Sequence, residues 1–276
     1  KRWYSNLRWV YRFLPFARST YRDASAIIAA SSQVCSEFAS YQDKLFFVPE
    51  PGISAAICSG ERLEKRSDGK AELIFVAGLT PNKGCDLALR AAAPLLRNGS
   101  AHFTILGDGP ERSRLEQLAK SLEIDQAVSF CGWVPHDEVF RRLRSADIMV
   151  FPSVRDNGAG AVFEALACGA VPVVADFGGP GDIVHQDVGR KMSLTNESDF
   201  VAQMERALTE LVNDRNLLEQ LRKQCMTYAR ERLTWDAKAK DTTQVLNWVL
   251  RQGPKPDFRS PKALDVVSSR GKKLLH

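Results

Sequence analysis

The stretch IMVFPSVRDNGAGAVFEALACGAVPVV, residues 148–174, decides the fold because it holds one complete strand–helix–strand unit. Ile148-Met149-Val150-Phe151 and Val171-Pro172-Val173-Val174 are short, nearly continuous apolar runs, as expected of strands that are buried on both faces. A glycine-containing loop between them leads into helical periodicity over residues 160–168. Strands joined through a helix run parallel, so this stretch predicts a parallel sheet covered by helices.

The same alternation of short apolar runs and longer amphipathic stretches begins at Glu72. Further strands are predicted at residues 73–77, 103–106 and 128–130. Further helices are predicted near residues 84–97, 111–122, 136–145 and 197–212. This alternation predicts a doubly wound α/β fold, in which ligands gather at the carboxyl ends of the strands.

The first 50 residues are organised differently, because they predict only two strands, at 26–30 and 45–48, with a helix between them. These elements cannot form a doubly wound domain alone. We therefore expect a truncated chain in which the beginning of the first domain is missing. The expected parts are the C-terminal remnant of that domain at 1–50, a linker at 51–71, a Rossmann-like domain at 72–235, a helix at 236–252 and a flexible tail at 253–276.

The composition of the 276-residue chain is typical of a globular protein, with 44% hydrophobic and 26% charged residues. The net charge is +5, and the Lys and Arg residues are spread along the chain, which argues against nucleic acid as a partner. Six cysteines form no CxxC pair and four histidines show no metal-ligand spacing. We therefore expect buried free thiols in a reducing compartment, the cytoplasm, and no metal site.

Residues 1–22 combine basic and aromatic side chains, and two interpretations of this segment remain open. It is either a helix of the first domain whose packing partners are missing, or a segment that lies on an anionic membrane surface. The second interpretation places the protein peripherally at the inner face of the membrane. No apolar run in the chain reaches the roughly 20 residues that a membrane span needs.

Three of the predicted strands end in segments with alternative interpretations. Residues 78–84 carry Lys83 ahead of a predicted helix, where an anion is favoured, although such a turn is commonly only solvated. Residues 107–111, Gly-Asp-Gly-Pro-Glu, form either a turn with a helix cap or a ligand loop. Residues 130–135 carry Trp133 and Val134, which either form one wall of a slot for a nucleobase or belong to the core.

The segment after residue 151 has the richest chemistry. Small residues at 158–161 let the backbone approach a ligand closely, and amides at the start of a helix can hold phosphate oxygens. Glu164, about one helical turn further on, can accept two hydrogen bonds from a diol such as a ribose. Asp156 lies eight residues before Glu164, in position to reach a neighbouring group. The alternative for Glu164 is a carboxylate that only interacts with the helix dipole.

Taken together, these segments resemble the retaining glycosyltransferases of family 4, which adopt the GT-B fold. The resemblance covers about residues 24–250 and rests on LGDGPER (106–112), FCGWVP (130–135), SADIMVFPS (145–153) and EALACGAVPVVADFGGPGDIV (164–184). It implies transfer of a sugar from a UDP-, GDP- or ADP-sugar to a carbohydrate or lipid-linked acceptor, in polysaccharide or glycolipid synthesis, with retention of configuration. The chain has no DxD motif, so we expect no cofactor and no metal requirement.

The resemblance also assigns roles to individual residues. Glu164 is implied to hold the ribose of the donor, and Asp156 to touch the donor sugar, so that these two form the catalytic pair. Trp133 and Val134 border the base. The diphosphate is neutralised by Lys83 and held by the backbone amides of Gly158, Ala159, Gly160 and Ala161.

Two departures from the family pattern affect this assignment. The family carries an arginine where this chain has Gly78, and Asp156 replaces the glutamate that is usual at that position. Arg155 is our candidate for the missing diphosphate-binding cation. The loss of that arginine and of the first domain favours one alternative, a non-catalytic nucleotide-sugar-binding fragment or subunit that needs a partner. A second alternative is another GT-B enzyme, such as a sugar-nucleotide epimerase.

Overall fold

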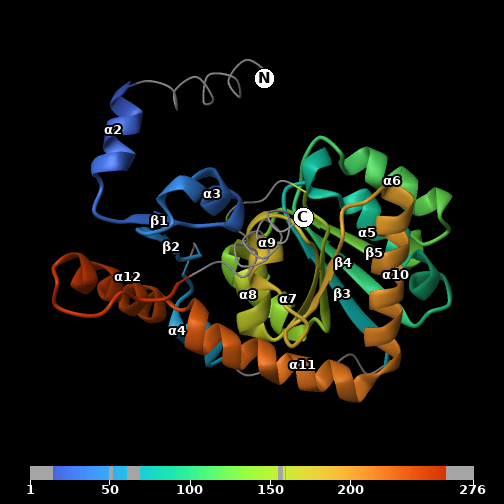
Figure 1. Ribbon diagram of the computed structural model, residues 1–276. Helices are drawn as coiled ribbons and strands as arrows, with labels where there is room; N and C mark the ends of the chain where they lie inside the picture. The colour runs from blue at the N-terminus through green and yellow to red at the C-terminus, as the bar shows by residue number, and fades with distance from the viewer. Residues whose placement is uncertain (1–14, 50–51, 61–68, 155–157, 159, 259–276) are drawn as a thin grey trace, which may run out of the picture. The chain divides into compact units, whose positions relative to one another are not determined.

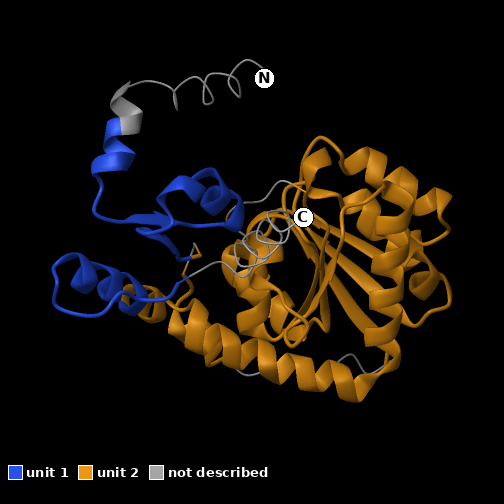
Figure 2. Cartoon of the chain, in the orientation of Figure 1, with its two compact units in different colours: residues 1–48, 240–276 blue, residues 49–239 orange. Residues whose placement is uncertain are grey.

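A computed structural model describes residues 15–49, 52–60, 69–154, 158 and 160–258. The chain divides into two compact units, one formed by residues 1–48 and 240–276 and the other by residues 49–239 (Figure 2). The division between 239 and 240 falls inside the helix α12 (Trp235–Val249). The candidate functional segments named above all belong to the larger unit.

The larger unit contains a sheet of six parallel strands in the order β5-β4-β3-β6-β7-β8. Its strands are β3 (Ala71–Val76), β4 (Ala101–Leu106), β5 (Val128–Gly132), β6 (Ile148–Phe151), β7 (Val171–Ala175) and β8 (Arg190–Met192). All residues of β6 and β7 are buried, as their continuous apolar runs predict for strands covered on both faces. The predicted doubly wound α/β fold is confirmed.

Helices cover both faces of this sheet (Figure 1). On one side α10 packs against α5 and α5 against α6, and on the other α8 packs against both α7 and α11. The bounds are α5 (Cys85–Arg97), α6 (Arg112–Ser121), α7 (His136–Ser145), α8 (Gly160–Cys168), α10 (Glu197–Asn213) and α11 (Arg215–Tyr228). The five helices predicted from periodicity all form, with ends within one residue of the expected ones.

Helix α4 (Ala55–Cys58) and three further elements of the larger unit lie outside the predicted set. Strand β8 is a three-residue edge strand with one buried side chain, so it carries no apolar run that could reveal it. Helix α9 (Gly178–Ile183) has the sequence GGPGDI, which is typical of a loop, yet five of its six residues are buried. Helix α11 is amphipathic, packs on α8, and buries residues that include Leu218 and Leu221.

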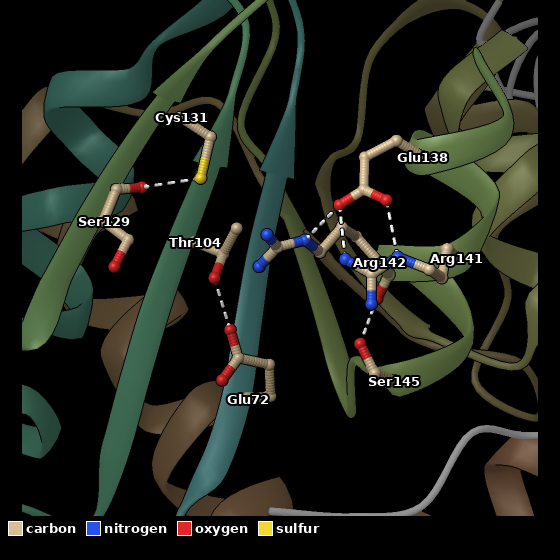
Figure 3. Close-up of polar contacts among 8 residues, drawn as sticks. All are labelled: Glu72, Thr104, Ser129, Cys131, Glu138, Arg141, Arg142 and Ser145. Atoms are coloured by element: carbon tan, nitrogen blue, oxygen red, sulfur yellow. Dashed lines mark hydrogen bonds and ion pairs between the residues drawn. The ribbon is translucent and has the colours of Figure 1, made fainter. Parts of the chain in front are cut away.

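Polar side chains connect the neighbouring strands β3, β4 and β5. The Thr104 hydroxyl donates to the Glu72 carboxylate over 2.5 Å, from β4 to β3 (Figure 3). His102 on β4 contacts Glu72 at 3.3 Å through Nδ1 and the Ser129 hydroxyl on β5 at 3.1 Å through Nε2. These bonds lie near the amino ends of the strands, opposite to the edge where ligands gather in such sheets, and therefore have a structural role.

The smaller unit contains the parallel strands β1 (Ile27–Ala29) and β2 (Leu45–Phe47), with the helix α3 (Ser32–Glu37) between them. This strand–helix–strand order agrees with the sequence pattern. The buried Phe46 ring packs edge-on against Trp248 of α12, with 5.2 Å between the centroids. The expected tail falls largely on residues 259–276, outside the described part of the chain, while Phe258 accepts a hydrogen bond from the Phe47 amide.

All six cysteines are free, and five of them are buried, while Cys131 is half-buried. Burial raises the pKa of the Cys168 thiol to about 12, which keeps this side chain protonated and unreactive at neutral pH. In the part of the chain that the structure describes, no helix combines the length and the apolar character needed to cross a bilayer.

Candidate functional site

The carboxyl ends of β3 and β6 meet at the point where the strand order of the sheet reverses. From β3 the chain continues through β4 to β5 on one side of this point. From β6 it continues through β7 to β8 on the other side. Ligands of doubly wound folds bind in the crevice at such a point. The loops that follow β3 and β6 contact one another there, because the Asn82 carbonyl accepts hydrogen bonds from the Val154 amide at 3.2 Å and the Ser153 hydroxyl at 3.3 Å.

Lys83 ends a short 3-10 turn in the loop after β3 (Pro81–Lys83). Its ammonium nitrogen lies 5.5 Å from the centroid of the Phe151 ring, at the end of β6. Gly84 follows with φ of 68°, and a Cβ there would come within 3.0 Å of the Pro152 carbonyl oxygen. Glycine therefore allows the two loops to close together, and the half-buried Lys83 brings a positive charge to the reversal point.

The glycine-rich turn after β4 packs directly against the loop after β3. Gly107 has φ of 137°, and a Cβ there would overlap the carbonyl oxygen of Ala77. At Gly109 a Cβ would come within 2.5 Å of the Leu79 carbonyl oxygen. The Leu79 amide also donates to the Asp108 carbonyl at 2.9 Å. These glycines serve the close approach of two backbones, which supports the interpretation of this segment as a turn. Glu111 is the N-cap residue of α6, but it makes no capping hydrogen bond through its side chain.

Replacement of Asp108 by alanine is expected to change the affinity for the nucleotide that the family resemblance implies by less than about twofold. The Asp108 carboxylate accepts from the Gly109 amide at 2.7 Å and from Arg112 at 3.4 Å, so its bonds are local and exposed. Such surface contacts contribute roughly a few tenths of a kcal/mol to the free energy of unfolding, so the Asp108→Ala variant is expected to stay folded. Calorimetric titration with the donor nucleotide measures the effect, and a loss above tenfold would show that Asp108 contacts the ligand.

Trp133 follows the end of β5 and is 78% exposed, so the interpretation of this side chain as core is wrong. Val134 is half-buried and packs against the core. An exposed indole next to an anchored valine can stack on an aromatic ligand without moving the strand. The remaining interpretation of Trp133, as one wall of a slot for a base, stays a prediction.

Glu164 is the fifth residue of α8, and its side chain is 19% exposed between the fully buried Phe163 and Ala165. Its carboxylate oxygen Oε1 lies 2.8 Å from Nε2 of His136, the first residue of α7. This hydrogen bond connects the segment after β5 with α8. His136 was not among the residues expected from the sequence, because a histidine 28 residues before its partner follows no local spacing.

Side chains within α7 contact one another, and one of these contacts orients His136. The imidazole packs on the Phe140 ring one turn later, with 4.5 Å between the centroids. Glu138 accepts hydrogen bonds from Arg141 and Arg142 on the same helix (Figure 3). These bonds, with the one from Arg141 as the larger cause, lower the pKa of Glu138 to about 2. Glu138 is therefore ionised at neutral pH and is engaged within α7.

The remaining expected ligands lie in the segment that leads into α8. Arg155, Asp156 and Ala159 fall outside the described residues, so their roles stay predictions. Gly158 is exposed, and a Cβ there would meet open space. Gly160 and Ala161 form the first turn of α8, where amide groups have no acceptor within the helix and the helix dipole favours an anion. Among the described residues there is no cluster of three metal-ligating side chains.

Known proteins resemble this chain over most of its length. An uncharacterised glycosyltransferase from Methanocaldococcus jannaschii is 28% identical over 240 residues, which cover 82% of this chain and 60% of that protein. The 2-deoxystreptamine glucosyltransferase of Streptomyces kanamyceticus is 27% identical over 165 residues, which cover 58% of this chain and 42% of that protein. The chain thus spans about half the length of these relatives.

A crystal structure of HepE from Anabaena in complex with UDP superimposes with a TM-score of 0.68 and 17% identity. The match covers 83% of this chain and 65% of that chain. It confirms the predicted GT-B type of fold. The model of the family described as Glycosyl transferases group 1 matches residues 61–232, which is more than half of the sequence. On the sheet order, the strand-end segments and this match together, the chain belongs to the glycosyl transferases group 1 family.

Proposed function

We propose that this chain supplies the donor-binding part of a glycosyltransferase that takes a sugar from a nucleoside diphosphate. The observation that carries the proposal is the meeting of the Lys83 loop with the loop that leads into α8 at the reversal point of the sheet. The half-buried Lys83 and the start of α8 match the diphosphate of such a donor. The Glu164 carboxylate, one turn further along α8, matches the ribose. HepE, whose fold is similar, was crystallised with UDP.

In this proposal each part of the donor has its own contact. Glu164 accepts hydrogen bonds from the ribose hydroxyls, and Lys83 and the amides of Gly158, Gly160 and Ala161 hold the diphosphate. Trp133 and Val134 border the base. Ala159 adds a fourth amide and Asp156 touches the donor sugar, two roles that the family resemblance implies. Arg155 compensates for the cation absent at Gly78, a role that the resemblance does not assign and that we propose.

The proposed transfer breaks the bond between the anomeric carbon and the β-phosphate oxygen. A new bond forms between that carbon and an acceptor hydroxyl oxygen, and the hydroxyl proton is released. The leaving diphosphate gains negative charge as the bond breaks. Lys83 and the positive end of α8 stabilise this charge because they are already oriented toward the strand ends. We propose retention of configuration and no metal requirement; product anomer analysis and turnover in EDTA test these two points.

The acceptor is proposed to be a carbohydrate or a lipid-linked saccharide, with the protein in the cytoplasm at the inner face of the membrane. The alternative is a donor-binding chain without turnover of its own. Gly78, in place of the family's arginine, favours this alternative because one positive charge near the diphosphate is lost. Hydrolysis and transfer assays with the chain, alone and within a longer form, separate the two. Donor binding by the chain alone, with turnover only in the longer form, would support the alternative.

The test of the proposed function is calorimetric titration of the chain with UDP, GDP and ADP and with their glucose conjugates. We expect binding of one nucleotide in the micromolar range, which is common for such substrates, and weaker binding of the other two. Titration with NAD is the control for non-specific binding to a Rossmann-like domain. If no nucleoside diphosphate binds at millimolar concentration, the proposal is wrong.

Replacing Lys83 by alanine is expected to weaken binding of the nucleoside diphosphate by about tenfold, the effect of losing one charge-assisted hydrogen bond. Affinity for the corresponding nucleoside, which has no phosphate, is expected to stay unchanged. Lys120→Ala, which removes an exposed lysine from the last turn of α6, is the matched control for net charge. An equal loss of nucleoside and diphosphate binding in Lys83→Ala would contradict a phosphate contact.

A further inference from the structure

His136 is placed between the two parts of the proposed donor site that contact the nucleoside. It follows Trp133, Val134 and Pro135 at the end of β5, and it begins α7. Its side chain is 66% exposed, so burial does not explain why it points at Glu164. The 2.8 Å contact between His136 Nε2 and Glu164 Oε1 is a hydrogen bond between this segment and α8, two elements that also pack on each other.

The hydrogen bond has a defined direction. A carboxylate only accepts hydrogen bonds, so Nε2 of His136 carries the proton and donates it to Oε1. The Phe140 ring against the imidazole limits the rotation of the histidine side chain. Glu164 has three side-chain torsions. When the ligand has to order this side chain on binding, the entropy cost of the ordering lowers the affinity for the ligand. Because Phe140 restrains the His136 imidazole, the hydrogen bond from His136 orders the carboxylate before the ligand binds. This removes part of the loss of affinity.

We propose that His136 is a positioning residue, which holds Oε1 of Glu164 so that the carboxylate is already oriented for the 2′- and 3′-hydroxyls of the donor ribose. This inference rests on the proposed function and names a residue that the family pattern does not assign. Oε2 makes no hydrogen bond to any residue that the structure describes, and Oε1 keeps a second lone pair. The Glu164 carboxylate can therefore accept hydrogen bonds from both ribose hydroxyls without breaking its contact to His136.

The test compares His136→Ala, His136→Gln, Glu164→Ala and the double variant His136→Ala/Glu164→Ala. The probes are whichever of UDP, GDP and ADP binds best and its 2′,3′-dideoxy analogue, both titrated calorimetrically. His185→Ala is the matched control, because His185 also contacts a carboxylate, that of Asp187 at 3.5 Å, and is 47% exposed. Circular dichroism and the unfolding temperature report on the fold, which loss of an exposed imidazole is expected to leave unchanged.

We expect His136→Ala to weaken nucleotide binding by about fivefold to tenfold, within the range measured for coupled neighbouring groups. The dideoxy analogue, which has no ribose hydroxyls, is expected to bind the wild type and His136→Ala equally. In the Glu164→Ala background the further loss of His136 is expected to have no effect. Glutamine, whose amide nitrogen can occupy nearly the place of Nε2, is expected to restore most of the affinity.

Four results would overturn the positioning role. Tighter nucleotide binding by His136→Ala would mean that the imidazole competes with the ribose for Glu164. A loss that persists in the Glu164→Ala background would mean that His136 contacts the nucleotide itself. If the wild type binds no nucleotide, the proposed function fails and the positioning role falls with it. If Glu164→Ala loses binding while His136→Ala does not, only the positioning role is wrong.

Discussion

Glu164→Ala is expected to weaken binding of the donor nucleotide by about 100-fold while the fold stays intact. A hydrogen bond to a charged acceptor contributes about 1.5–3 kcal/mol, and each 1.4 kcal/mol changes an affinity tenfold. Alanine removes the acceptor for both ribose hydroxyls, but neighbouring bonds do not add fully. Helix α8 tolerates the change because alanine has the highest helix propensity and the Glu164 side chain is partly exposed. Isothermal titration with the ribonucleotide and its 2′,3′-dideoxy analogue measures the effect.

Glu164→Gln is the matched variant for this prediction, because it keeps the size of the side chain and removes the charge. We expect it to lose about tenfold in affinity, since the amide keeps one accepting oxygen. The dideoxy analogue is expected to bind all three proteins equally. If Glu164→Ala bound the ribonucleotide within twofold of the wild type, the carboxylate would be a helix-dipole partner and not a ribose ligand.

Gly107→Ala is expected to lower the free energy of unfolding by about 3 kcal/mol or more, the range of strain and overpacking in a backbone junction. Its φ of 137° is a conformation that alanine rarely adopts, and the new Cβ would overlap the Ala77 carbonyl oxygen. Relief requires that the loops after β3 and β4 separate, which breaks the hydrogen bond between the Ala77 amide and the Leu106 carbonyl. Urea unfolding followed by circular dichroism measures the change.

Gly78→Ala is the control from the same junction. Its Cβ would meet only the Asp108 carbonyl oxygen at 3.8 Å, an ordinary contact. We expect its free energy of unfolding to stay within about 0.5 kcal/mol of the wild type. If Gly107→Ala and Gly78→Ala unfolded at the same urea concentration, the close approach of the two loops would not matter for stability.

The fold was predictable where burial leaves a periodic pattern in the chain. Strands β6 and β7 are covered on both faces, so their residues are all apolar and their ends are marked by turn residues. The edge strand β8 has one face toward solvent and needs no such run. Four of the six residues of helix α9 are glycine or proline, all four are buried, and Gly181 packs against Asp176. Its helical form depends on tertiary packing and not on propensity.

The candidate site was predictable in part, because some of its residues depend on local sequence alone. Lys83 follows a strand and precedes a helix start, and Glu164 lies one turn into the helix that follows residues 148–151, so each could be recognised within its own segment. The closeness of the two segments depends on strand order, which no local pattern specifies. His136 shows the limit most clearly, since its partner is 28 residues away on another helix.

By itself, the sequence determined which segments are buried strands, which are helices, and which strand ends carry charged or glycine-rich loops. The physical reason is that burial and backbone geometry act on neighbouring residues, through periodicity and through glycine and proline. Only the tertiary structure decided that β3 and β6 are neighbours, that Gly107 touches Ala77, and that His136 meets Glu164. These contacts arise from parallel pairing and helix packing between distant segments, for which the chain carries no local signal.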